Sequence, residues 1–390
     1  MSAWLAFIWR NSRSRSLARA SLSINIGLAA LASFVCALPQ AFAESNPPSK
    51  QSTASPPTCA TCHVGVATSY IHAPMHHALE NAGANPVLDT HPNLTVVKDG
   101  YTYTVETKDG KSTYTVTDGK DTLTLPIRWM FGQHSQTWVL EKDGLFYESM
   151  VSYFPRENGL ATTPGDQHLT PHSVFEAMGR RTSTWETLQC FNCHATGAAD
   201  GPKLTLDTLR PGVECERCHI GAIQHMADAA KDNFATIPPK LKLMDAEQSA
   251  NFCGQCHRTW DTVVRNNWKG AVDVRFQPYR LENSRCFAAN DRRISCLACH
   301  DPHQPLNQNA ASYDAKCQAC HSTAKASTAS SSATPASVST NAATSLAKVC
   351  PVSKENCASC HMPKVELPGG HVAFTDHLIR VVHPGDPYPF

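Results

Sequence analysis

Apolar and polar residues follow an alternating pattern in only one part of the chain. Between Leu94 and Phe154 they alternate, and Asp-Gly pairs beginning at Asp99, Asp109 and Asp118 interrupt the alternation. Alternation is typical of strands with one buried face, and Asp-Gly is a common hairpin turn. The stretch therefore predicts a small antiparallel sheet of about five or six strands near residues 94–154. Short helical or irregular segments are expected elsewhere.

A continuous apolar run from Ile24 to Leu38 lies near the N-terminus. Four arginines precede this run, and small residues surround Ala43. This order is typical of a secretory signal peptide with cleavage after Ala43. The alternative is a retained membrane anchor, but the run is shorter than the roughly 20 residues that a spanning helix needs. We therefore expect a periplasmic or otherwise exported protein with no transmembrane segment after cleavage.

The charges are nearly balanced, with 34 basic and 33 acidic residues in 390. Cleavage after Ala43 removes four arginines and no acid, so 30 basic residues remain against 33 acidic ones. A chain with no basic excess lacks the electrostatic footprint of a nucleic-acid-binding protein. Cysteine is the compositional outlier, because the chain has 17 of them.

Fourteen of the 17 cysteines fall in seven copies of the pattern CxxCH. Each copy supplies two cysteines followed directly by a histidine: Cys59, Cys62 and His63; Cys190, Cys193 and His194; Cys215, Cys218 and His219; Cys253, Cys256 and His257; Cys296, Cys299 and His300; Cys317, Cys320 and His321; Cys357, Cys360 and His361.

Three kinds of site use two cysteines at this spacing. In a c-type haem site, both thiols lie on one side of a helical turn and form thioethers with the haem vinyl groups, and the next histidine is the proximal iron ligand. A zinc site needs paired CxxC units and gives no reason for a histidine after every second cysteine. A redox dithiol would be a single CxxC in a βαβ unit. The pattern favours seven covalently bound haem c groups, which are attached outside the cytoplasm.

The motif positions divide the chain into segments. We expect a mostly α-helical or irregular multihaem cytochrome c fold organised around covalent haems, with the small antiparallel sheet as an insertion near residues 94–154. The closely spaced motifs leave little room for a conventional core. The expected order is a signal peptide (1–43), a Pro/Ser-rich tether (44–58), a first haem segment (59–93), an antiparallel β subdomain (94–160), a five-haem core (161–321), a low-complexity loop (322–349) and a C-terminal haem segment with a ligand-bearing tail (350–390).

Each iron can take a second axial ligand. His303 lies three residues after the proximal His300. That span is at most roughly 10 Å, so His303 cannot reach the far face of its own porphyrin. The same reasoning applies to His225, six residues after His219. Both are expected to ligate a neighbouring haem, which predicts that the haems are interleaved.

The remaining candidates for distal ligands come from several segments. His134 lies in a predicted turn between two strands, and His371 and His377 share a tail segment. Near the first motif, Met75 competes with three histidines. Those three are His72, His76 and His77; His168 and His172 are weaker candidates for a seventh ligand, and His91 and His383 are not expected to be ligands.

Several longer stretches resemble one known family. GVECERCH followed by a nearby His, CGQCHR, SRCF before ISCLACHDPH, NCASCHMPK and the closing HVAFTDHLIRV are similar to the multihaem cytochromes c of the cytochrome c554-related group. The resemblance runs from Cys59 to about Val382, and it implies Met75, His134, His225, His303 and His377 as distal ligands. The chain departs from the family at Ile220, Gly221 and Ala222, where Gly-Pro-Gly is typical.

Two further cysteines of the mature chain lie outside the motifs, Cys286 and Cys350. They are either two unrelated thiols or a disulfide. Because exported proteins meet an oxidising compartment, we expect a disulfide that fixes the chain after the low-complexity loop.

Two classes of function fit these features. The first is an electron-transfer protein whose closely packed, mostly six-coordinate haems connect redox partner proteins, such as a membrane-bound quinol-oxidising complex or another cytochrome. The alternative is a multihaem oxidoreductase that reduces or oxidises a small nitrogen or sulfur compound at one five-coordinate haem. Catalytic haems of nitrite reductases commonly use CxxCK, and every motif here ends in His. Electron transfer is therefore the favoured function, and no catalytic residue is assigned.

Overall fold

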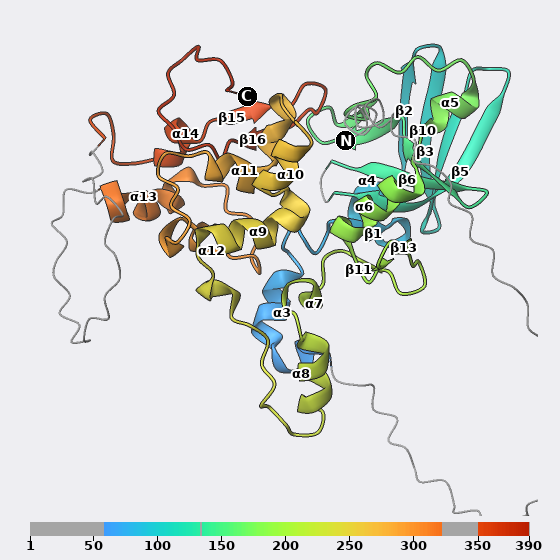
Figure 1. Ribbon diagram of the computed structural model, residues 1–390. Coiled ribbons are helices and arrows are strands. Elements are labelled where there is room, and N and C mark those ends of the chain that lie inside the picture. The colour runs from blue at the N-terminus through green and yellow to red at the C-terminus, as the bar shows by residue number, and fades with distance from the viewer. Residues whose placement is uncertain (1–57, 133–134, 322–349, 390) are drawn as a thin grey trace, which may run out of the picture.

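The computed structural model describes residues 58–132, 135–321 and 350–389. The predicted signal peptide, the low-complexity loop and the candidate ligand His134 lie outside the described residues. Figure 1 shows an antiparallel sheet on one side, a group of short helices on the other, and an arm of helices between and below them. None of the described helices is long and apolar enough to cross a membrane.

The sheet is antiparallel throughout and has eight strands. Its strand order is β10-β7-β6-β5-β4-β3-β2, and β1 also pairs with β5. The strands are β1 (Leu79–Asn81), β2 (Asn93–Lys98), β3 (Tyr101–Lys108), β4 (Lys111–Thr117), β5 (Thr122–Phe131), β6 (Thr137–Lys142), β7 (Leu145–Ser149) and β10 (Gly179–Arg181). A separate hairpin consists of β8 (Val151–Phe154) and β9 (Gly159–Thr162).

The three predicted Asp-Gly turns are confirmed, and they connect β2 to β3, β3 to β4 and β4 to β5. Asp99 and Asp109 adopt φ of 52°, and the glycine after each also has a positive φ. Two consecutive positive φ angles define the type I′ turn, whose twist matches that of the flanking strands.

The sheet region has a conventional hydrophobic core. On β3 the buried residues are Tyr101, Tyr103 and Val105, which alternate with more exposed threonines as the sequence pattern predicts. They pack with Leu88 of α4 (Pro86–Thr90) and Met178 of α5 (Val174–Met178), both fully buried. This core lies entirely between residues 82 and 178, where no CxxCH motif occurs.

The expectation of a mostly α-helical or irregular fold with a small sheet near residues 94–154 is wrong. The sheet curls into a half-barrel and extends from Leu79 to Arg181. Its additional strands β1 and β10 have three residues each, so they are too short to show an alternating pattern. They are strands because they pair with β5 and β7, and this pairing cannot be predicted from the residues of the strands themselves.

The remaining structure consists of short helices and two- or three-residue strands. The helices are α2 (Cys59–Cys62), α3 (Val64–Tyr70), α6 (Thr184–His194), α7 (Cys215–Cys218), α8 (Ala222–Ala229), α9 (Ala246–His257), α10 (Trp260–Arg265), α11 (Gln277–Glu282), α12 (Cys296–Cys299), α13 (Asp314–His321) and α14 (Cys357–His361). The 3-10 helices are η1 (Ala82–Ala84), η2 (Leu241–Leu243), η3 (Ala271–Arg275), η4 (Arg292–Ile294) and η5 (Ala310–Tyr313). The small ladders pair β11 (Ala195–Thr196) with β14 (Arg210–Pro211), β12 (Ala199–Asp200) with β13 (Lys203–Leu204), and β15 (Lys364–Glu366) with β16 (Ala373–Thr375).

Helix α6 joins the sheet to the helical part of the molecule. Its N-terminus has a capping box in which Ser183 and Glu186 satisfy each other's backbone N–H groups. Phe191 of α6 is buried against Trp129 of β5, with ring centroids 5.2 Å apart. The second CxxCH motif, at the end of this helix, is therefore fixed on the sheet.

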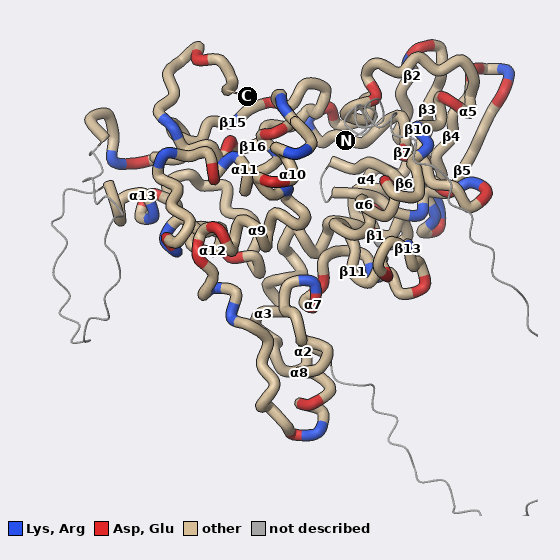
Figure 2. The backbone as a smooth tube through the Cα atoms, in the orientation of Figure 1, with Lys and Arg blue, Asp and Glu red and all other residues tan. Residues whose placement is uncertain are grey.

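Charged residues of both signs are mixed along the backbone (Figure 2). Many lie in pairs, such as Arg156 with Glu366, whose side chains are 2.9 Å apart. This pair connects the turn after β8 to β15 near the C-terminus. The tail of the chain therefore returns to the sheet region.

Candidate haem-binding sites

Each CxxC forms one turn of helix. In α2, α7 and α12 the four residues of CxxC are the whole helix, and α14 consists of the five residues of its CxxCH motif. In the other three cases, α6, α9 and α13, the motif ends a longer helix. The backbone N–H of His219 donates to the carbonyl of Cys215 at 2.8 Å, and the same bond from His300 to Cys296 is 2.9 Å long. Residues three apart lie on the same side of such a turn, so both thiols and the histidine face one region of space.

The structure places three motif histidines next to histidines from distant segments. His63 lies opposite His225, with ring centroids 6.4 Å apart. His219 lies opposite His303 at 5.9 Å, with their planes only 13° from parallel. The third pair is His300 and His377, at 6.1 Å.

This spacing suits one metal ion between each pair. A metal–imidazole bond is about 2 Å long and the ring centre lies about 1 Å beyond the nitrogen, so two axial imidazoles on one iron have centroids about 6 Å apart. Among the described residues, no group of three or more His, Cys, Asp or Glu side chains could hold a metal ion. Each facing pair offers two axial ligands, and a porphyrin carries the four equatorial ones itself. The residues present therefore fit haem.

Hydrogen bonds at Nδ1 orient several of these rings. His361 donates from Nδ1 to the carbonyl of Arg380 at 2.8 Å, and His377 donates to the carbonyl of Thr375 at 3.0 Å. His194 makes the same bond to the carbonyl of Ala78 at 2.8 Å. A bond at Nδ1 fixes the ring and leaves Nε2 as the metal ligand.

Burial keeps two of these imidazoles neutral. It lowers the pKa of His194 to about 4, and it lowers the pKa of His377 to about 4. A neutral imidazole has a free lone pair, so it is the form that binds a metal.

Cysteines of different motifs also lie side by side. The thiols of four pairs are close enough to shift one another's pKa: Cys59 with Cys215, Cys193 with Cys256, Cys253 with Cys296, and Cys317 with Cys357. The first motif is thus next to the third, the second next to the fourth, the fourth next to the fifth, and the sixth next to the seventh.

Two arginines beside the second and fourth motifs also fit a haem. Arg258 follows His257 and packs over Trp268, and Arg275 packs over Phe374. Burial and the guanidinium of Arg258 lower the pKa of Arg275. Within the described residues, no carboxylate makes a hydrogen bond or ion pair with either arginine. The carboxylate of Glu148 acts on Arg275 only through its charge, without a hydrogen bond. Haem propionates are carboxylates, so bound haem would add counter-charge beside these arginines.

The other predicted ligands have different surroundings. Met75 is half-buried, and its carbonyl accepts a hydrogen bond from the N–H of Val213, just before the third motif. The ring of His371 packs against that of Phe154, with centroids 4.8 Å apart, and its Nδ1 donates to Glu157 at 2.8 Å. His371 therefore lies at the turn after β8, and among the described residues it makes no ring contact with a motif histidine.

The histidines that were weaker candidates or were not expected to be ligands are either hydrogen-bonded at both ring nitrogens or exposed. Both ring nitrogens of His77 are hydrogen-bonded, to Glu80 and to the carbonyl of Ile71, and both of His91 are also bonded. His168 and His172 are exposed. Neither His77 nor His91 has a nitrogen free to bind iron in this arrangement.

The expected disulfide is not present in the structure. Cys286 and Cys350 are both free thiols. The thiols that raise the pKa of Cys286 through their charge are Cys317 and Cys320 of the sixth motif. The sequence argument used only the redox compartment, and it gave no information on the distance between the two residues.

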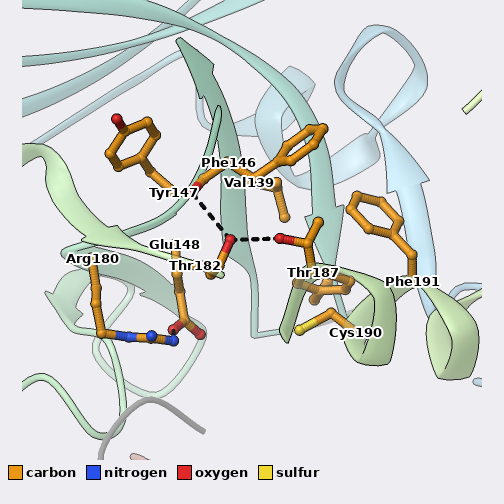
Figure 3. Close-up of a pocket in the computed structure, with 10 residues that line it drawn as sticks. Val139, Phe146, Tyr147, Glu148, Arg180, Thr182, Thr187, Cys190 and Phe191 are labelled. Carbon is orange, nitrogen blue, oxygen red and sulfur yellow. Dashed lines mark hydrogen bonds and ion pairs between the residues drawn. The ribbon is translucent and has the colours of Figure 1, made fainter. Parts of the chain in front are cut away.

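A cavity lies between the sheet and α6, beside Cys190 of the second motif (Figure 3). Phe146 and Phe191 line it, and Arg180 forms an ion pair with Glu148 at its edge. Its volume is about 20 Å³, which is room for about one water molecule. It is therefore a packing gap under the second motif and is too small for a substrate.

The motif geometry and the paired imidazoles fit a c-type cytochrome. Residues 167–220, which include the second and third motifs, match the family model described as cytochrome c554 and c-prime. This match supports a cytochrome c with covalently bound haem c that acts in electron transfer or redox chemistry. No curated protein and no solved structure matches the chain.

Proposed function

We propose that the protein is an exported heptahaem c-type cytochrome that passes electrons between redox partners through closely packed, mostly six-coordinate haems. When bound, haem iron supplies one-electron redox chemistry. The observation that carries the proposal is the set of three facing imidazole pairs, His63 with His225, His219 with His303, and His300 with His377.

The pairs support a relay because each joins two motif segments. His225 follows the third motif but faces the histidine of the first, and His303 follows the fifth motif but faces the histidine of the third. A segment that supplies a ligand to one haem and the CxxCH motif of another would keep these two haems close together. The thiol contacts between motifs support the same packing.

Two axial protein ligands also bear on the choice between carrier and enzyme. An iron with imidazoles on both faces has no position for a substrate, so the first, third and fifth haems are proposed as carriers. We retain Met75, His134 and His371 as proposed distal ligands of other haems. The competing function, oxidation or reduction of a small nitrogen or sulfur compound, requires a vacant position at one of those other haems.

Location and partners belong to the same proposal. The apolar run and the arginines before Ala43 support export to the periplasm, because covalent haem attachment takes place outside the cytoplasm. The partners are proposed as other redox proteins, such as a membrane-bound quinol-oxidising complex or a second cytochrome.

The first test is the haem content and spin state of the purified holoprotein. Intact mass should correspond to seven haems per chain, and the ferric spectrum should be dominated by low-spin iron. Replacement of His225, His303 or His377 by Ala should convert one haem each to high spin, whereas the same change at the exposed His383, which is not expected to be a ligand, should convert none. Fewer than seven haems would refute the heptahaem proposal. Stoichiometric carbon monoxide binding at one haem of the unmodified protein would refute a pure carrier and favour the enzyme.

A further inference from the structure

A buried cluster of charged side chains connects α11 to the C-terminal tail. Arg280 donates from Nε to Asp376 Oδ1 and from Nη2 to Asp376 Oδ2, both at 2.8 Å. The side chains are 3% and 0% exposed, so the pair lies inside the protein. This bidentate geometry fixes the carboxylate in orientation as well as in position.

Other groups complete the cluster. Arg380 also donates to Asp376 Oδ2, and Arg280 donates from Nη1 to the carbonyl of Pro389 at 2.8 Å. Arg280 is 3.4 Å from Asp273, which accepts a hydrogen bond from Tyr388. Two arginines face two aspartates, so the cluster is electrically balanced and needs no further ion.

One side of this cluster holds His377, the residue after Asp376. The N–H of Leu378 donates to Asp376 Oδ1 at 3.0 Å, which closes a tight turn around the histidine. The hydroxyl of Ser284 donates to the carbonyl of His377 and accepts from the N–H of Ile379. The backbone of His377 is therefore fixed on both sides, and its ring centroid lies 6.1 Å from that of His300.

The other side holds His361, the histidine of the seventh motif. The N–H of Arg380 donates to the carbonyl of His361 at 3.2 Å, and Nδ1 of His361 donates to the carbonyl of Arg380 at 2.8 Å. The guanidinium of this same Arg380 is held by Asp376. One carboxylate thus restrains the segment that carries one histidine and the residue that orients another.

We propose that the Arg280–Asp376 pair is a positioning device for two haems at once. It positions His377 beside His300, where the two histidines would hold the fifth haem, and through Arg380 it orients the ring of His361, which would hold the seventh haem. The inference rests on the proposed function because it takes both histidines as axial ligands. It adds a structural link between two haems whose motifs are about 60 residues apart.

The test is Asp376→Asn in the holoprotein, followed by low-temperature electron paramagnetic resonance of the ferric state. Asn has one acceptor oxygen where Asp has two, so it cannot keep the bidentate bond from Arg280, and it loses the negative charge that holds both arginines. Two haem signals should therefore change, and the rest should stay the same. His377→Ala identifies the signal of the fifth haem. That signal should be one of the two that Asp376→Asn changes. Arg280→Lys keeps the charge but loses the bidentate geometry, and it should alter the same two signals.

The matched control is Asp261→Asn, which removes the partner of Arg265 in an exposed pair, and it should alter no signal. Because Asp376→Asn leaves buried charges unpaired, a second variant, Arg280→Met with Asp376→Leu, removes both charges and keeps apolar volume. It should retain the circular dichroism of the fold and still alter the two signals.

The outcomes separate the two proposals. If the double variant folds and leaves every haem signal unchanged, or if it changes only one, the positioning proposal is overturned. If the unmodified protein has no low-spin signal that His377→Ala removes, then the ligation itself is wrong and the proposed function fails at the fifth haem.

Discussion

Glu282 provides a sharp test of the electrostatics of the helical part of the molecule. It ends α11, and burial together with repulsion from Glu247 raises the pKa of its carboxyl from 4.5 to about 7. We expect Glu282→Gln, which removes this ionisation and keeps the shape, to stabilise the protein above neutral pH.

The sign follows from proton binding. In the unfolded chain the carboxyl ionises near pH 4.5, whereas in the folded protein it keeps its proton until about pH 7. The unfolded state therefore binds fewer protons in this window, and the free energy of unfolding falls as pH rises from 4.5 to 7. The full difference corresponds to about 3 kcal/mol, and screening at this half-exposed side chain reduces it to about 1–2 kcal/mol.

The assay is urea unfolding of both holoproteins, followed by far-ultraviolet circular dichroism. At about pH 4 the two free energies of unfolding should agree, because Glu282 is protonated in both states. At about pH 8 the variant should be more stable by about 1–2 kcal/mol. Glu106→Gln, at an exposed position of β3, should give no pH-dependent difference. A stabilisation that is the same at both pH values, or larger in acid, would refute the reasoning.

Three further predictions concern stability, and all can be measured by urea unfolding. Leu88→Ala leaves a cavity in the fully buried core of the sheet, and should cost about 2–5 kcal/mol; a cost near zero would contradict the assigned core. Asp245→Ala removes the N-cap of α9 and should cost about 1 kcal/mol; an unchanged midpoint would show that the cap contributes nothing. Gly212→Ala places a Cβ 2.0 Å from the backbone oxygen of His76 at a φ of 78°, so it should cost more than Gly201→Ala, whose Cβ at φ 55° meets no atom within 4 Å; equal costs would contradict the clash.

The sequence located the sheet but not its full extent. Strands β2 to β5 alternate over six to ten residues and are separated by Asp-Gly turns, so local pattern alone identifies them. By contrast, β10 is Gly179–Arg181, and nothing in Gly-Arg-Arg indicates a strand. It exists because its backbone pairs with β7, and pairing between distant segments is a tertiary property.

Part of the candidate site could likewise be predicted from the sequence, and part could not. The CxxCH spacing is a local signal with a chemical reason, so every proximal histidine can be proposed from sequence. The positions of His225 and His303 exclude ligation of their own haems, but only the structure brings them to His63 and His219. The Arg280–Asp376 pair left no sequence signal, since the two residues are single charges 96 positions apart.

The separation between the sheet core and the motifs also bears on how the protein matures. The buried cluster between residues 82 and 178 contains no cysteine, so it can form by burial of its own side chains before any haem is attached. The facing pairs are different, because His63 must find His225 and His300 must find His377 across long stretches of chain. We expect the sheet to fold early and to present α6 as a fixed starting point. Each later haem attachment would then bring the next segment of the chain into contact with the folded part, so that assembly proceeds from the sheet toward the C-terminus.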